Sequence, residues 1–155
     1  MTSRRQFLLL TCGAIATAAE AQLPSNIEVL RRAAFQEAIR KVVGDAKVQE
    51  GKVKLELPPL VDNGNAVPLS VEVESPMTPG DHVKAIHVFT ERNPQPYVLT
   101  AHLGPRAGRA RIATRARIAE TGLVTAIAQM SDGSFWSDSV KVIVTLSACL
   151  EEGLI

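Results

Sequence analysis

The chain has 155 residues, of which 17 are Lys or Arg and 16 are Asp or Glu, so its formal net charge is +1. This length is that of one domain, and the near-neutral balance gives no overall electrostatic attraction to nucleic acid or to anionic membranes. The two cysteines and three histidines give no recognised zinc-binding spacing.

The first 21 residues are typical of an export signal that is later removed. A basic pair, Arg4-Arg5, precedes an apolar stretch at positions 7–19 and a small-x-small cleavage site at positions 19–21. The apolar stretch is too short to span a bilayer, which needs about 20 apolar residues. Adjacent arginines within "SRRQFL" favour the twin-arginine (Tat) address over a general secretion signal that happens to carry two arginines. We therefore predict a protein of the bacterial periplasm.

Cleavage after residue 21 would remove both of these arginines together with Glu20 and Cys12. The mature chain then keeps 15 basic residues, 15 acidic residues and one cysteine, Cys149. In an oxidising compartment an odd cysteine indicates an intermolecular disulfide or a thiol kept for chemistry, with an inert buried cysteine as the alternative. Because the Tat pathway transports folded proteins, a small domain without an evident cofactor site also suggests a partner that is exported with it.

The mature chain begins with a predicted helix within residues 22–46. Ser25 or Asn26 can cap its N-terminus, and Gly44 suits its end. Apolar residues recur at spacings of three and four, which predicts the face that packs on the rest of the domain: Ile27, Leu30, Ala34, Ala38 and Val42.

From residue 47 to residue 146 the apolar period changes to two, which is typical of strands. Turn-forming stretches such as "DNGN" and "SDGS" separate the predicted strands. Their ranges are 52–57, 69–74, 82–90, 97–103, 109–118, 122–130 and 135–146. About seven short strands with frequent turns predict a mostly β fold, an immunoglobulin-like antiparallel β-sandwich with an N-terminal helix.

The strand predicted at 109–118 places four arginines on one face, namely Arg109, Arg111, Arg115 and Arg117. They could contact an anionic ligand or partner, or they could form a solvated face that protects a sheet edge from aggregation. No aromatic residues are interleaved with them for base stacking, so nucleic acid is not an expected partner.

The other polar side chains form no catalytic pattern in the sequence. His82 and His87 are five residues apart and would point to opposite faces of a strand, and His102 adds no zinc-binding spacing. The sequence also lacks a serine nucleophile elbow, a phosphate-binding glycine loop and a marked pair of carboxylates. We therefore predict a protein without a metal, a cofactor or a catalytic centre of its own.

Cys149 directly follows the last predicted strand, on a short C-terminal arm formed by residues 147–155. A thiol on a short arm can enter the pocket of another protein. A thiolate is a strong nucleophile and can hold a sulfur-containing adduct through a disulfide-like bond. This placement suggests a covalent carrier.

Six stretches of the mature chain resemble the SoxY family, the carrier subunits of the bacterial periplasmic sulfur-oxidation (Sox) system. They are "GKVKLELP" (51–58), "NGNAVPLSVEVESPMT" (63–78), "VKAIHVFTERNPQP" (83–96), "TRARIAET" (114–121), "VTAIAQMSDGSFW" (124–136) and "VKVIVT" (140–145). The resemblance implies that intermediates of thiosulfate oxidation are bound covalently to Cys149 and presented to separate Sox enzymes. It also implies a heterodimer with SoxZ, an immunoglobulin-like protein that lacks a signal and is exported with SoxY, and no membrane partner.

The arm departs from the family pattern, which ends in Gly-Gly-Cys-Gly-Gly. The corresponding residues here are Ser147-Ala148-Cys149-Leu150-Glu151, followed by residues 152–155. The bulkier residues reduce the freedom of the backbone, and two glutamates add negative charge beside the thiol.

Two hypotheses about the function follow. The first is a SoxY-type carrier, whose Cys149 holds cargo or forms a disulfide-linked dimer. The second is a divergent SoxY-like binding or structural subunit that has lost or changed its cargo.

Overall fold

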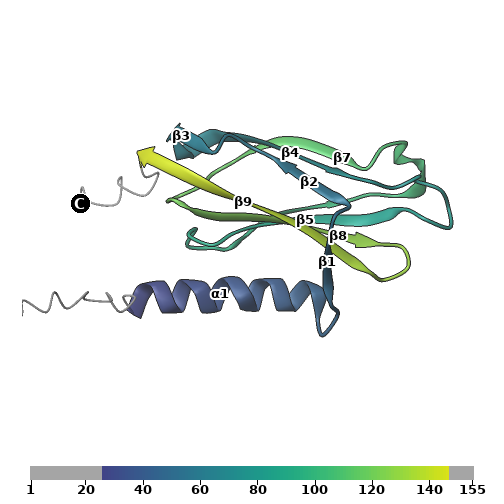
Figure 1. The fold of residues 1–155 in the computed structure, drawn as a ribbon, viewed down its shortest axis with the longest axis horizontal. Coiled ribbons are helices and arrows are strands. Elements are labelled where there is room, and N and C mark those ends of the chain that lie inside the picture. Colours follow the sequence, from purple (N-terminus) through teal and green to yellow (C-terminus); the bar gives the residue numbers. More distant parts are fainter. Residues whose placement is uncertain (1–25, 147–155) are drawn as a thin grey trace, which may run out of the picture.

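The structure is a computed structural model, and it describes residues 26–146. One helix, α1 (Asn26–Val43), lies along one face of a sandwich of two β-sheets (Figure 1). This arrangement confirms the predicted mostly β, immunoglobulin-like sandwich with an N-terminal helix. Within the described residues, no helix is long and apolar enough to cross a membrane.

The larger sheet has six strands. Five follow the order β1 (Val48–Glu50), β9 (Phe135–Leu146), β8 (Gly122–Met130), β5 (Val83–Thr90) and β6 (Tyr97–His102), and β3 (Leu60–Asn63) also pairs with β9. The alternating pattern predicted β5, β6, β8 and β9 well. It missed β1 and β3, which are only three and four residues long and pair parallel with β9 in an otherwise antiparallel sheet.

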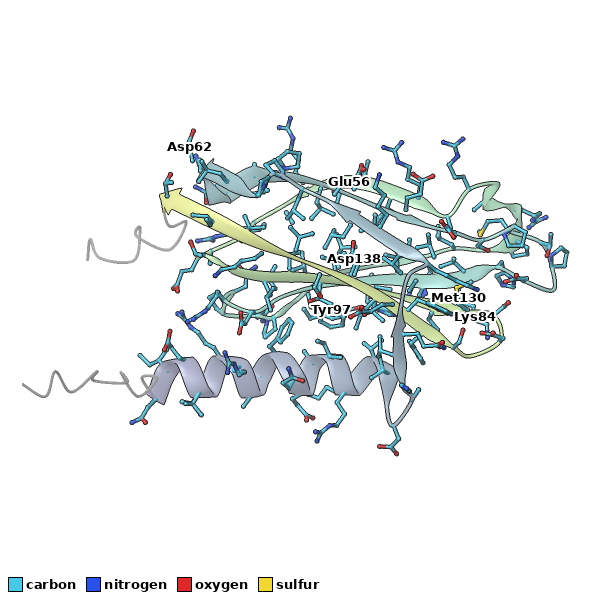
Figure 2. All side chains as sticks on the ribbon, viewed as in Figure 1. Glu56, Asp62, Lys84, Tyr97, Met130 and Asp138 are labelled. Atoms are coloured by element: carbon cyan, nitrogen blue, oxygen red, sulfur yellow. The ribbon has the colours of Figure 1, made fainter. Side chains whose placement is uncertain are left out.

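The smaller sheet is antiparallel, in the order β2 (Val53–Glu56), β4 (Val67–Val73) and β7 (Arg111–Ala116). Two short 3-10 helices, η1 (Gly64–Ala66) and η2 (Pro105–Ala107), lie in its connections. The sheets also meet along β2 and β9, where the Leu55 amide donates a hydrogen bond of 2.8 Å to Asp138 Oδ2. Figure 2 shows Asp138 between the two layers.

The main core lies between the two sheets and consists of aliphatic side chains that alternate along the strands. Val71 comes from the smaller sheet, and Val88, Val124 and Val142 come from the larger one; all four are fully buried. Burial of one such side chain contributes about 1.5–3 kcal/mol, so this layer holds the two sheets together.

The helix packs through a different face than the one predicted. Phe35 is buried against Phe89, Ile127 and Phe135 of the larger sheet. The predicted contacts of Ala38 and Val42 are present, but Ile27 and Leu30 are 61% and 68% exposed, and Ala34 is exposed as well. The prediction was therefore wrong for the first half of the helix.

Ion pairs, and not apolar contacts, attach the first half of α1 to the sandwich. Both carboxylate oxygens of Glu120 accept hydrogen bonds of 2.8 Å from Arg31 Nη1. Arg92 lies 2.9 Å from Glu28, and Arg32 lies 3.6 Å from Glu91. Of the helix residues in these pairs, Glu28 and Arg31 turn towards the sandwich, whereas the Arg32 side chain is 75% exposed. Because Glu28 and Arg31 take the inward positions of the first two turns, the neighbouring apolar residues stay exposed.

Candidate functional site

The sequence-predicted attachment residue, Cys149, lies outside the described residues, as do the signal residues Arg4 and Arg5. The structure does describe the root of the arm, which is the C-terminal part of β9. Asp62 marks β3 at the end of the sandwich where β9 finishes, and α1 begins at the same end (Figures 1 and 2).

Hydrogen bonds hold the last residues of β9 from both sides. On one side, β3 pairs with β9 in the register Leu60 to Ile143, and the Ile143 amide donates to the Pro59 carbonyl at 2.8 Å. On the other side, the Thr121 hydroxyl accepts a hydrogen bond of 2.9 Å from the Val144 amide and lies 3.3 Å from the Val144 carbonyl. These hydrogen bonds therefore hold β9 as far as Val144, five residues before Cys149 in the sequence.

Gly64 brings the β3 corner close to the segment that precedes β8. The Ile118 amide donates to the Gly64 carbonyl at 2.8 Å. A Cβ atom at position 64 would lie only 2.1 Å from the Ile118 carbonyl oxygen and 3.1 Å from Val144 Cγ1. Only glycine permits this close approach, so the "DNGN" stretch does more than form a turn.

Glu120, the residue before Thr121, connects the arm root to the helix. Its carboxylate is bound by Arg31 of α1, and the two side chains are 34% and 30% exposed. Since Thr121 in turn holds Val144, one short path of hydrogen bonds runs from the helix to β9. This path positions the last strand relative to the helix that lies beside it.

The three histidines do not converge on a common site. His82 precedes β5, His87 is buried within β5, and His102 is exposed at the end of β6. Among residues 26–146, no group of three His, Cys, Asp or Glu side chains could hold a metal ion.

His87 lies among aromatic side chains on the side of the sheet that faces α1. Its Nδ1 is 2.7 Å from the Thr100 hydroxyl, which also contacts the Tyr97 hydroxyl. Tyr97, which is labelled in Figure 2, meets Phe89 edge to face with 5.4 Å between the ring centroids. Within the described part of the chain, Nε2 of His87 has no hydrogen-bond partner.

Burial lowers the pKa of His87 below its usual value, and the charge of His102 lowers this pKa further. The unfolded chain takes up a proton near pH 6.5, whereas the folded protein keeps this ring neutral to lower pH. The stability that this difference provides is present above about pH 6.5 and is lost as the pH falls below it.

We expect the melting temperature of His87→Gln to fall less than that of the native protein between about pH 7.5 and about pH 5. His82→Gln controls for the loss of an imidazole elsewhere, and equal falls in all three proteins would contradict this role of His87.

The arginine strand is shorter than predicted, since β7 covers only Arg111–Ala116, and its alternation holds except at Thr114, which is exposed. Arg109, Arg111, Arg115 and Arg117 are all exposed, while Ala110, Ala116 and Ile118 on the other face are buried. Arg111 lies 4.0 Å from Glu72 on the neighbouring strand, which is typical of a solvated mixed-charge face. Because β7 is an edge strand, these charges also protect that edge from strand pairing with other chains.

Comparison with known proteins connects this sandwich and its arm root to one family. The family described as sulfur oxidation protein SoxY matches residues 39–149, from the second half of α1 through β9 to Cys149. The chain belongs to the SoxY family. This result confirms the resemblance carried by the six sequence stretches.

Solved structures agree with this family assignment. The sulfur carrier protein SoxY from Chlorobium limicola f thiosulfatophilum is 26% identical, with a TM-score of 0.61, covering 74% of this chain and 98% of that one. Two superoxide reductases share the fold alone. The one from Ignicoccus hospitalis is 16% identical, with a TM-score of 0.54, covering 61% of this chain and 80% of its own. The one from Nanoarchaeum equitans is 12% identical, with a TM-score of 0.52, covering 62% of this chain and 100% of its own. No curated protein shows significant sequence similarity to the chain.

Sequence reasoning did not identify the residues that hold the end of β9 in this SoxY family member. Thr121 and Glu120 act on partners 23 and 89 residues away, Val144 and Arg31. Nothing in the sequence around a threonine and a glutamate that precede a strand indicates contacts with such distant residues. The "TRARIAET" stretch was noted for its resemblance, but its last two residues gain a specific role only from the fold.

Proposed function

We propose that this SoxY family member is a periplasmic carrier that binds intermediates of thiosulfate oxidation covalently on Cys149. The observation that carries the proposal is the extent of the family match, which passes through β9 and ends on Cys149. The similar protein from Chlorobium limicola, described as a sulfur carrier, supports the same reading. A thiolate is the nucleophile that such a role requires.

The proposed carrier uses a fixed base and a short reactive arm. Thr121 and β3 hold β9 up to its last residues, so the cargo has a defined distance from the sandwich. With Cys149 three residues beyond Leu146, the arm can reach about 10 Å from the sheet. The thiol would enter the pocket of a partner enzyme while the sandwich binds the surface of that enzyme, and the partner enzymes would perform the redox chemistry.

We also propose that the protein acts with a SoxZ-like subunit and reaches the periplasm through the Tat pathway. The Arg4-Arg5 signal favours export of an already folded protein, which allows a partner without a signal to be transported with it.

A second candidate is a divergent SoxY-like subunit that keeps its partner but has lost or changed its cargo. The observation that favours it is the arm sequence, in which Ser147, Ala148, Leu150 and Glu151 stand where the family pattern has glycine. Bulkier residues would hinder entry into a narrow pocket.

The test is the intact mass of the protein purified from the periplasmic fraction of thiosulfate-oxidising cells without reductant. We expect sulfur-containing mass additions that a reductant removes, together with a co-purifying SoxZ-like subunit. In Cys149→Ser the additions should be absent, and the melting temperature should be nearly unchanged because arm residues contribute little burial. Unmodified native protein with its partner would favour the divergent subunit, and a large fall in melting temperature would identify the cysteine as a core residue.

A further inference from the structure

Three apolar side chains of the larger sheet remain exposed where β9 ends. Leu60 is 58% exposed, Leu123 is 39% exposed and Ile143 is 50% exposed. Leu60 is the cross-strand partner of Ile143, and Leu123 is the partner of Lys141, two residues before Ile143 on β9. Because paired residues and residues two apart share a face, all four side chains project from one face of the sheet.

This is the face of the sheet on which α1 lies. Ile127, four residues after Leu123 on β8, is buried in one cluster with Phe35 of α1. The first half of the helix adds two apolar side chains, Ile27 and Leu30, which are more exposed than the three of the sheet. Packing within the domain does not account for their apolar character, because ion pairs attach this half of the helix.

The ion pairs of α1 also show in which direction Ile27 and Leu30 point. Arg32 pairs with the residue that follows β5, and Arg31 pairs with a residue that precedes β8. Each residue of an α-helix is rotated by about 100° from the one before, so Ile27 and Leu30 lie on the side of Arg31 that is turned away from Arg32. In the sheet, β9 is the neighbour of β8 on the side away from β5. Both side chains are therefore on the flank of α1 that is directed towards β9.

The exposed apolar residues of the helix and of the sheet thus gather at the end of the sandwich where β9 finishes and α1 begins (Figure 1). We call these five residues the arm-end surface: Ile27, Leu30, Leu60, Leu123 and Ile143. Apolar side chains that gather in one exposed region of a small domain are typical of protein contact surfaces.

The arm-end surface includes an available cation. Lys141, which lies opposite Leu123 on the same face, is exposed and forms no ion pair with any residue from 26 to 146. The surface therefore suits a partner that presents apolar side chains together with a carboxylate.

Three kinds of partner could cover this surface: an enzyme that takes up the arm, a second copy of the chain, and the SoxZ-like subunit. Enzymes that use a carrier in turn must release it, and short-lived interfaces are smaller and less apolar than those of permanent complexes. A second copy would place two Lys141 side chains in one apolar interface, where like charges are unfavourable. A permanent subunit with an apolar and acidic contact face satisfies both the apolar residues and the lysine.

We propose that the arm-end surface binds the SoxZ-like subunit, and that an acidic group of this subunit faces Lys141. The inference rests on the proposed function, which includes such a subunit, and it adds the place where the subunit binds. The subunit stands beside the end of β9, so an enzyme that takes up the thiol meets both subunits at once.

The experiment measures the dissociation constant between the chain and the co-purifying SoxZ-like subunit by isothermal titration calorimetry, with a reductant present so that neither a disulfide nor cargo contributes. We expect Leu30→Ser and Ile143→Ser each to weaken binding about tenfold, because each removes an apolar contact from a different element of the surface. Val29→Ser is the matched control, with an expected change below about twofold. Val29 is 52% exposed and directly precedes Leu30, but it lies with Arg32 on the other flank of α1.

The charge of the surface is tested by Lys141→Glu, which should weaken binding about tenfold, and by Lys141→Arg, which should preserve it. Melting temperatures check that each variant is folded. If Leu30→Ser and Ile143→Ser bound the subunit as tightly as Val29→Ser does, the inference would be overturned while the partner proposal stood. A native chain that binds no SoxZ-like subunit would overturn the partner proposal itself. A native chain that sediments as a dimer and becomes a monomer with Ile143→Ser would show that a second copy covers the surface, and this too would overturn the inference.

Discussion

Replacing Gly64 with alanine is expected to destabilise the protein by about 3 kcal/mol, the upper part of the range for overpacking a buried position. The new Cβ would lie 2.1 Å from the Ile118 carbonyl oxygen, a backbone atom that cannot move without disturbing the bond between Ile118 N and the Gly64 carbonyl. In a domain of this size, 3 kcal/mol lowers the melting temperature by about 10 °C. Thermal and urea unfolding followed by circular dichroism would measure both quantities.

The matched control is Gly104→Ala. Gly104 precedes η2 with an extended backbone (φ −138°), and a Cβ there would have no atom within 4 Å. The expected change is within about 0.5 kcal/mol, as for other surface substitutions. If the two variants were equally stable, the close approach of the β3 corner to Ile118 would not be a requirement of the fold.

Long apolar stretches between clear turn signals made the long strands predictable from the sequence. The ranges 122–130 and 135–146 coincide with β8 and β9, although β8 is buried on both faces and only the second half of β9 alternates between buried and exposed side chains. β1 and β3 are too short for a period to be visible, and their parallel pairing with β9 depends on where the chain returns after the helix and after β2. Short-range patterns do not contain that information.

The first half of α1 illustrates a different limit. Ile27, Leu30 and Ala34 form an apolar stripe, yet Glu28 and Arg31 face the sandwich because Arg92 and Glu120 are placed to receive them. These two partners lie 64 and 89 residues away in the sequence, and their ion pairs determine which face of α1 packs on the sandwich. Helical spacing alone cannot identify such partners. The same holds for the arm root, where the hydroxyl of Thr121 gains its role from the position of Val144.

The largest gain of function is expected when the arm is rebuilt to the glycine pattern of the SoxY family. The substitutions are Ser147→Gly, Ala148→Gly, Leu150→Gly and Glu151→Gly, with Cys149 retained and residues 152–155 deleted. Glycines narrow the arm and free its backbone, so the thiol should enter pockets that evolved for such an arm more readily. With Sox enzymes from a system whose carrier has the glycine arm, we expect thiosulfate turnover to rise clearly above that of the native chain.

Three further proteins show which property of the arm sets the rate in this reconstituted assay. Cys149→Ser should reduce turnover to the rate measured without carrier, since no other residue is proposed to hold cargo. A glycine arm that keeps residues 152–155 separates the effect of the glycines from that of the four additional residues, and deletion of those residues from the native arm tests the additional residues alone. Equal rates for native and glycine arms would mean that the glycines are dispensable. No turnover with either arm, while the SoxZ-like partner still binds, would instead favour a different cargo, because the thiol would then be reaching enzymes that do not recognise what it carries.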